Sequence, residues 1–116
     1  MVPFTIEAER QLGAYVIRIA GELDLAGCPE LESALREAER AQADRIIVDL
    51  EALTFIDSDG LGTILKSSRR STSEGSRLQV TRGIGQPAEM FRLTGLDRAL
   101  PLIDPLALPV DAPGVR

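Results

Sequence analysis

The sequence predicts an α/β fold built on one mostly parallel sheet. Segments with the alternating pattern of a strand are separated by segments whose apolar residues recur at helical spacing, in the order ββαβαβαβ. The 116 residues suit a single domain that buries one core. The sequence contains no internal repeat that would suggest another architecture.

The first elements are two strands and a helix. Phe4 to Glu9 alternates apolar and polar residues, as a half-buried strand does, and Ala14 to Ala20 repeats the pattern. Gln11-Leu12-Gly13 lies between them and suits a turn, so the two segments predict a hairpin. A helix is predicted from Pro29, which favours the first helical position, to about Ala43. Its apolar stripe consists of Leu31, Ala34, Leu35 and Ala38.

The remaining pattern predicts three strands and two helices. In chain order they are a central strand at Ile46-Ile47-Val48, a helix from about Ser58 to Ser73, a strand from Leu78 to Thr81, a helix from Pro87 to Thr94 and a strand within Leu100 to Ile103. Gly95 suits the end of the second of these helices. Lys66, Arg69 and Arg70 occupy the polar side of the first, where we expect solvated charges. Residues 105–116 form a proline-rich tail.

Composition excludes several classes of function. The formal net charge of −5 argues against a nucleic-acid partner, which requires a basic patch, and favours a protein partner. The single cysteine, Cys28, excludes an internal disulfide, and the absence of histidine excludes a Cys/His zinc site and a serine-histidine catalytic pair. No segment resembles a secretion signal or a membrane span. We therefore expect a cytoplasmic protein without a cofactor.

A polar junction in the middle of the chain is the main candidate site. An apolar run ends in Asp57-Ser58-Asp59-Gly60, and apolar residues then resume at helical spacing from Leu61. Ser or Asp at such a junction can accept hydrogen bonds from the first free amides of a helix, which predicts a capped helix. The second interpretation is an exposed Ser58 hydroxyl at the positive end of the helix, where a phosphate would be favoured.

A second candidate residue is expected beside this junction. Loops that follow the carboxyl ends of parallel strands lie at one edge of the sheet. The Glu22 to Cys28 loop and the Thr54 to Gly60 loop both follow predicted strands. We therefore expect Asp24 and Ser58 to share a rim.

Three segments carry a family likeness. They are Gly-Glu-Leu-Asp at 21–24, the Ile-Val-Asp-Leu and Leu-Thr-Phe-Ile-Asp-Ser-Asp-Gly-Leu-Gly motifs within 47–62, and Leu-Thr-Gly-Leu-Asp-Arg at 93–98. With them the sequence resembles the STAS family, and within it the bacterial anti-sigma factor antagonists of the SpoIIAA and RsbV type. The resemblance implies a single STAS-like domain at residues 1–104. Its sheet would have four to five strands, with an antiparallel strand at the N-terminus and helices mainly on one face.

The resemblance also implies a partner-switching function without enzymatic activity. In the family, the unphosphorylated protein binds an anti-sigma factor that is also an ATP-binding serine kinase, which releases the sigma factor; phosphorylation of one serine ends the binding. That serine corresponds to Ser58, and Asp24 matches an acidic residue that contacts the kinase. A serine phosphatase is a further candidate partner, and the free protein is expected to be a monomer. The implied partner-binding residues are Asp24, Asp57, Ser58, Asp59, Gly60 and Leu61.

Three alternatives stay open. Asp59 stands where the family commonly has Ser or Thr, and the carboxylates of Asp57 and Asp59 would repel a phosphate on Ser58. The first alternative is therefore an antagonist that is regulated without phosphorylation. The second is a scaffold or ligand-sensing STAS module in a stress-signalling complex. The third is a magnesium-dependent phosphatase that uses Asp57 and Asp59, because Asp-Ser-Asp-Gly resembles the nucleophile loop of haloacid-dehalogenase-type enzymes. The later motifs of that fold are missing after Gly62.

Overall fold

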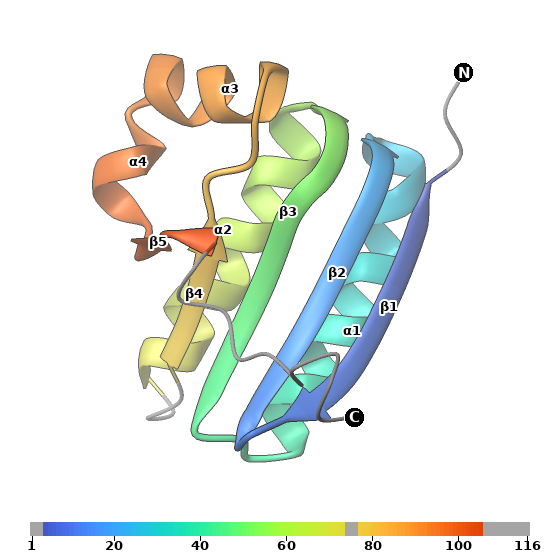
Figure 1. Ribbon diagram of the computed structural model, residues 1–116, viewed down its shortest axis with the longest axis vertical. Coiled ribbons are helices and arrows are strands. Elements are labelled where there is room, and N and C mark those ends of the chain that lie inside the picture. The colour runs from blue at the N-terminus through green and yellow to red at the C-terminus, as the bar shows by residue number, and fades with distance from the viewer. Residues whose placement is uncertain (1–3, 74–76, 106–116) are drawn as a thin grey trace, which may run out of the picture.

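The computed structural model describes residues 4–73 and 77–105 (Figure 1). Within them one sheet has the strand order β1-β2-β3-β4-β5, with β1 antiparallel to β2 and the other neighbours parallel. The strands are β1 Thr5–Gln11, β2 Ala14–Leu23, β3 Arg45–Ile56, β4 Arg77–Thr81 and β5 Leu102–Ile103. The helices are the short 3₁₀ helix η1 Leu25–Gly27, α1 Cys28–Arg40, α2 Ser58–Ser73, α3 Gln86–Thr94 and α4 Leu96–Ala99. Figure 1 shows α1 and α2 on one face of the sheet, which confirms the predicted fold class.

The N-terminal hairpin is confirmed, with a tight turn. Gln11 pairs with Ala14, so the loop consists of Leu12 and Gly13 alone. Both residues have positive φ, at 50° and 83°, as a two-residue turn of type I′ requires. This geometry lets the first strand extend to Gln11, two residues beyond its predicted end.

The predicted length of the central strand is wrong, because β3 continues through Thr54 to Ile56. Its pairing with β2 shifts register twice, and at each shift β3 contains one more residue than β2. Such bulges break the two-residue period of a strand. Leu50, Leu53 and Ile56 are therefore three residues apart and still all buried on the core side. Because this three-residue spacing differs from the alternation of a regular strand, the second half of β3 was not predicted.

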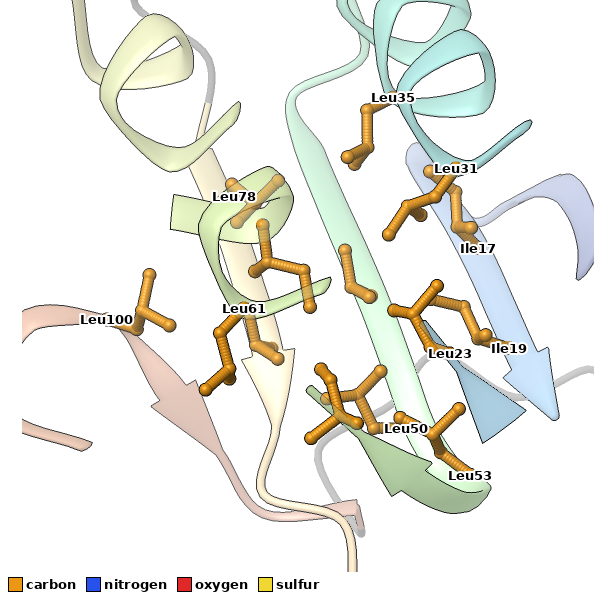
Figure 2. Close-up of a cluster of buried hydrophobic side chains, with 14 of the residues drawn as sticks. Ile17, Ile19, Leu23, Leu31, Leu35, Leu50, Leu53, Leu61, Leu78 and Leu100 are labelled. Atoms are coloured by element: carbon orange, nitrogen blue, oxygen red, sulfur yellow. The ribbon is translucent and has the colours of Figure 1, made fainter. Parts of the chain in front are cut away.

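The core lies between the sheet and its two long helices. The predicted stripe of α1 is confirmed, because Leu31, Leu35 and Ala38 are fully buried and Ala34 packs against them. Figure 2 shows leucines from α1 and α2 converging on side chains of the strands. Burial of each large aliphatic side chain stabilises the fold by about 2 kcal/mol. This layer is therefore the main source of stability.

An ionic cluster ties α1 to α2. Glu39 Oε2 accepts hydrogen bonds from Ser67 Oγ at 2.8 Å and Arg70 Nη2 at 2.9 Å, and Arg70 also lies 3.2 Å from Glu32. Burial acts to raise the pKa of Glu39, but the hydrogen bonds of Arg70 and Ser67 and the charges of Arg70 and Arg36 outweigh it. The pKa of Glu39 therefore lies below its ordinary value. The prediction of a solvated charge is wrong for Arg70, whose side chain is only 20% exposed.

The C-terminal elements differ from the predicted pattern in one additional helix and a shorter last strand. Gly95 ends α3 in the left-handed conformation, with φ of 76°, as predicted. The single turn α4 that follows was not predicted, and the last strand covers only Leu102 and Ile103. The proline-rich tail predicted from residue 105 lies, from residue 106 on, outside the described residues.

Candidate functional site

The two candidate loops meet at one end of the sheet. Leu23 and Ile56 are register partners at the ends of β2 and β3, and the Asp57 amide donates to the Leu23 carbonyl at 3.2 Å. Asp24 and Asp57 follow these two residues directly. Asp24 and Ser58 therefore share a rim of the sheet, as predicted.

Asp57, and not Ser58, caps α2. Asp57 Oδ1 accepts from the Gly60 amide at 3.0 Å, and the Asp57 carbonyl accepts from the Leu61 amide at 3.0 Å. Ser58 is the first residue of the helix and is exposed. Its hydroxyl makes no hydrogen bond to any residue that the structure describes. The capping interpretation thus applies to Asp57, and the exposed-hydroxyl interpretation applies to Ser58.

The carboxylate of Asp24 is held in place by its own loop. Asp24 Oδ1 accepts from the Ala26 amide at 3.0 Å, which caps η1. The Asp24 carbonyl accepts from the Gly27 amide at 3.0 Å and from Cys28 Sγ at 3.4 Å. Asp24 itself remains exposed, as does Asp59 in the first turn of α2. The rim therefore presents a hydroxyl among fixed negative charges.

Two of the predicted partner-binding residues lie beneath the rim. Gly60 is buried, and Leu61 is only 3% exposed within the core. A Cβ atom on Gly60 would lie 2.9 Å from both Ile56 Cγ1 and Leu23 Cγ. These residues therefore support the site by seating the first turn of α2 on the strand ends, and they present no side chain to a partner.

Exposed apolar residues of this region were not predicted from the sequence. Leu25, Phe55 and Ile84 are 67%, 38% and 64% exposed. Leu25 follows Asp24, Phe55 precedes the last residue of β3, and Ile84 lies in the loop that joins β4 to α3. A sequence signal existed for Ile84, because an apolar residue between Gly83 and Gly85 has no strand or helix to bury it.

The sequence also gave no indication of the role of Gln86. Its Oε1 accepts from the Ile56 amide, and its Nε2 donates to the Ile56 carbonyl, both at 2.9 Å. The first residue of α3 is thus bonded to the strand end that leads to Ser58.

Other kinds of site find no support in the described residues. Among them, no group of three or more carboxylate or thiol side chains is arranged to hold a metal ion. No helix in this part of the chain has the length and apolar character needed to cross a membrane.

Comparison with known proteins adds a family and its relatives. Residues 6–104 match the family model described as Mlab, STAS domain. The "Anti-sigma F factor antagonist" of Paenibacillus polymyxa is 30% identical over 100 residues, which cover 85% of this chain and 86% of that protein. A crystal structure of an anti-sigma factor antagonist from Mycobacterium paratuberculosis superposes with a TM-score of 0.80 at 27% identity, covering 90% and 88% of the two chains. The Bacillus cell fate determinant SpoIIAA in its phosphorylated form gives a TM-score of 0.65 at 25% identity, covering 88% and 90%.

Proposed function

The chain belongs to the STAS domain family, and we propose that it is an anti-sigma factor antagonist that acts by partner switching. In this proposal the unphosphorylated protein binds an anti-sigma factor that is also an ATP-dependent serine kinase, and the sigma factor is released. Phosphorylation of Ser58 then ends the binding, and a serine phosphatase restores it. These partners act on transcription, so the proposal places the protein in the cytoplasm. The free protein is proposed to be a monomer.

The observation that carries the proposal is that Asp57 and Ser58 have different roles at the start of α2. Asp57 satisfies the helix amide, which leaves the Ser58 hydroxyl exposed and available to a partner. Asp24 lies on the same rim, and the exposed apolar residues nearby offer contact area. The names of the relatives support the same function, and SpoIIAA is known in a phosphorylated form.

The proposed reaction takes place on the kinase. Ser58 Oγ attacks the γ-phosphorus of ATP, the bond from that phosphorus to the bridging oxygen breaks, and ADP leaves. The hydroxyl proton passes to a base of the kinase. Ser58 gains a group of about −1.5 to −2 charge. The first amides of α2 attract this charge, while Asp57 and Asp59 repel it.

Phosphorylation should weaken the complex because it places a charge where the interface held a neutral hydroxyl. A buried, unpaired charge at an interface costs about 2–5 kcal/mol. Each 1.4 kcal/mol is about a tenfold change in affinity. We therefore expect the phosphorylated protein to bind its partner at least about 30-fold more weakly.

The test uses two alanine variants and partner capture from the native cell. Ser58→Ala should retain its ATP-binding partner when ATP is added and should accept no labelled phosphate. The matched control is Ser33→Ala, an exposed serine on α1, which should be labelled and released as the wild type is. Labelling of Ser58→Ala at another residue would refute the assignment.

The same capture experiment and a phosphatase assay decide between the alternatives. A wild-type complex that persists in ATP, with Ser58 unmodified, would indicate a scaffold or an antagonist that is regulated differently. Magnesium-dependent hydrolysis of p-nitrophenyl phosphate that is lost in Asp57→Asn would indicate a phosphatase. The capping role of Asp57 does not favour that alternative, because one carboxylate oxygen is already bonded to the Gly60 amide.

A further inference from the structure

We propose that Gln86 is a positioning residue for Ser58. Its carboxamide fixes the end of β3 from which the Ser58 junction departs, and this sets the rate at which Ser58 is phosphorylated. The kinetic part of this inference rests on the proposed function. The geometric part concerns the protein alone and is tested without a partner.

The strand end needs a bonding partner on its outer edge. The Asp57 amide points toward β2, where it bonds to Leu23. Successive backbone groups of a strand point to opposite edges, so the amide and carbonyl of Ile56 point away from β2. In the described residues, β4 pairs with only the first four of the twelve residues of β3, up to Val48. Gln86 supplies the donor and the acceptor that a neighbouring strand would otherwise provide.

The outer edge of β3 is only partly hydrogen-bonded between its pairing with β4 and its contact with Gln86. Thr81 Oγ1 accepts from the Leu50 amide at 2.8 Å, and Glu51 Oε2 accepts from the Gly83 amide at 3.0 Å. Beyond these bonds, a cavity of about 390 Å³ lies between β3 and the loop that joins β4 to α3. It is lined by Glu51, Ala52, Leu53, Thr54, Ile84, Gly85 and Gln86. Among the described residues, Gln86 is therefore the side chain that holds the outer edge of the strand between this cavity and Ser58.

A short series of hydrogen bonds then leads to the hydroxyl. Gln86 holds Ile56, the next residue Asp57 is held by Leu23, and the Asp57 carboxylate holds the first turn of α2. Ser58 lies within this series, two residues after Ile56. Loss of the Gln86 bonds would leave a backbone donor and acceptor unpaired and release the strand end. Small displacements of a reacting group can lower a rate by an order of magnitude or more.

The test replaces Gln86 by glutamate. A carboxylate at this position still accepts from the Ile56 amide, but it cannot donate to the Ile56 carbonyl and repels it. A protonated carboxyl can donate again, so acidification should restore the native bonds. The matched control is Gln79→Glu near the other end of β3. Gln79 Oε1 accepts from Arg45 at 2.9 and 2.7 Å, so a carboxylate there keeps its partner.

Amide spectra of the isolated protein test the geometry. At pH 7 the ¹H–¹⁵N resonances of Ile56, Asp57 and Ser58 should be displaced in Gln86→Glu and unchanged in Gln79→Glu. They should return toward the wild-type positions as the new carboxyl protonates on acidification. Wild-type positions at both pH values would overturn the inference. If Gln86→Glu fails to fold, Gln86→Ala tests the same displacement without the added charge.

Kinase assays test the consequence. The kcat/KM for phosphorylation of Ser58 should fall about tenfold or more in Gln86→Ala and Gln86→Glu and remain unchanged in Gln79→Glu. Equal rates in all variants would overturn the kinetic part. A cognate kinase that fails to label even the wild type would overturn the proposed function and the kinetic part with it, and the amide spectra would still decide whether Gln86 positions the junction.

Discussion

Replacing Gly60 by alanine tests the close contact that seats the first turn of α2. The added methyl carbon would lie 2.9 Å from Ile56 Cγ1, 2.9 Å from Leu23 Cγ and 3.0 Å from Leu23 Cδ2. Relaxed carbon–carbon contacts are about 3.5–4.0 Å. Leu23 and Ile56 are both fully buried within the core, so any movement of theirs must displace the side chains packed around them. The helix or the two side chains must shift.

Gly62 offers a matched control in the same helix, because a Cβ atom there meets nothing within 4 Å. Both substitutions gain about 1 kcal/mol of helix propensity. Gly60→Ala also carries an overpacking cost of about 1–3 kcal/mol. The gain is common to both variants, so Gly62→Ala should be the more stable by about 1–3 kcal/mol, the overpacking cost alone.

Thermal and urea unfolding followed by circular dichroism measure this difference. In a domain of this size about 1 kcal/mol shifts the Tm by 4–8 °C, so Gly62→Ala should melt at least about 4 °C above Gly60→Ala. The displaced helix start should also weaken partner binding in Gly60→Ala but not in Gly62→Ala. Equal midpoints for the two variants would refute the argument that Gly60 is needed for close packing.

Three further predictions concern carboxylates. Burial acts to raise the pKa of Glu39, but the bonds and charge of Arg70 outweigh it, so its folded pKa lies below the ordinary 4.5. The stabilisation that the Glu39 carboxylate contributes is therefore present at neutral pH and is lost as the pH falls through its lowered pKa. Between pH 7 and 3 the Tm of the wild type should decrease more than that of Glu39→Gln, and parallel decreases would contradict this. Asp57→Ala should lower the free energy of unfolding by about 1 kcal/mol in urea titrations, and Asp57→Asn by less, because its amide oxygen can still cap; equal losses would show that capping is not the cause. Asp59→Asn should accelerate phosphorylation of Ser58, since it removes a neighbouring negative charge; a slower reaction would indicate that the kinase binds Asp59.

Local patterns were sufficient for some elements and failed for others. The stripe of α1 and the N-terminal hairpin are properties of neighbouring residues, and both were predicted, although the turn itself proved one residue shorter than the predicted Gln11-Leu12-Gly13. The second half of β3 was missed because its bulges make sense only against β2. Arg70 was misplaced because the carboxylate that draws it inward lies on another helix.

The sequence by itself determined the order of the strands and of helices α1, α2 and α3, the candidate site at the start of α2 and the family motifs, because periodicity and motifs are contained in contiguous residues. Only the tertiary structure decided that Asp57 caps the helix and leaves Ser58 exposed, that Gly60 and Leu61 lie beneath the rim, and that Gln86 holds the end of β3. Each of these depends on directional bonds or close contacts within a few ångströms. The Asp57 cap is a local bond, and the sequence left open whether Asp57 or Ser58 makes it. The contacts of Gly60, Leu61 and Gln86 exist only once distant segments have packed together.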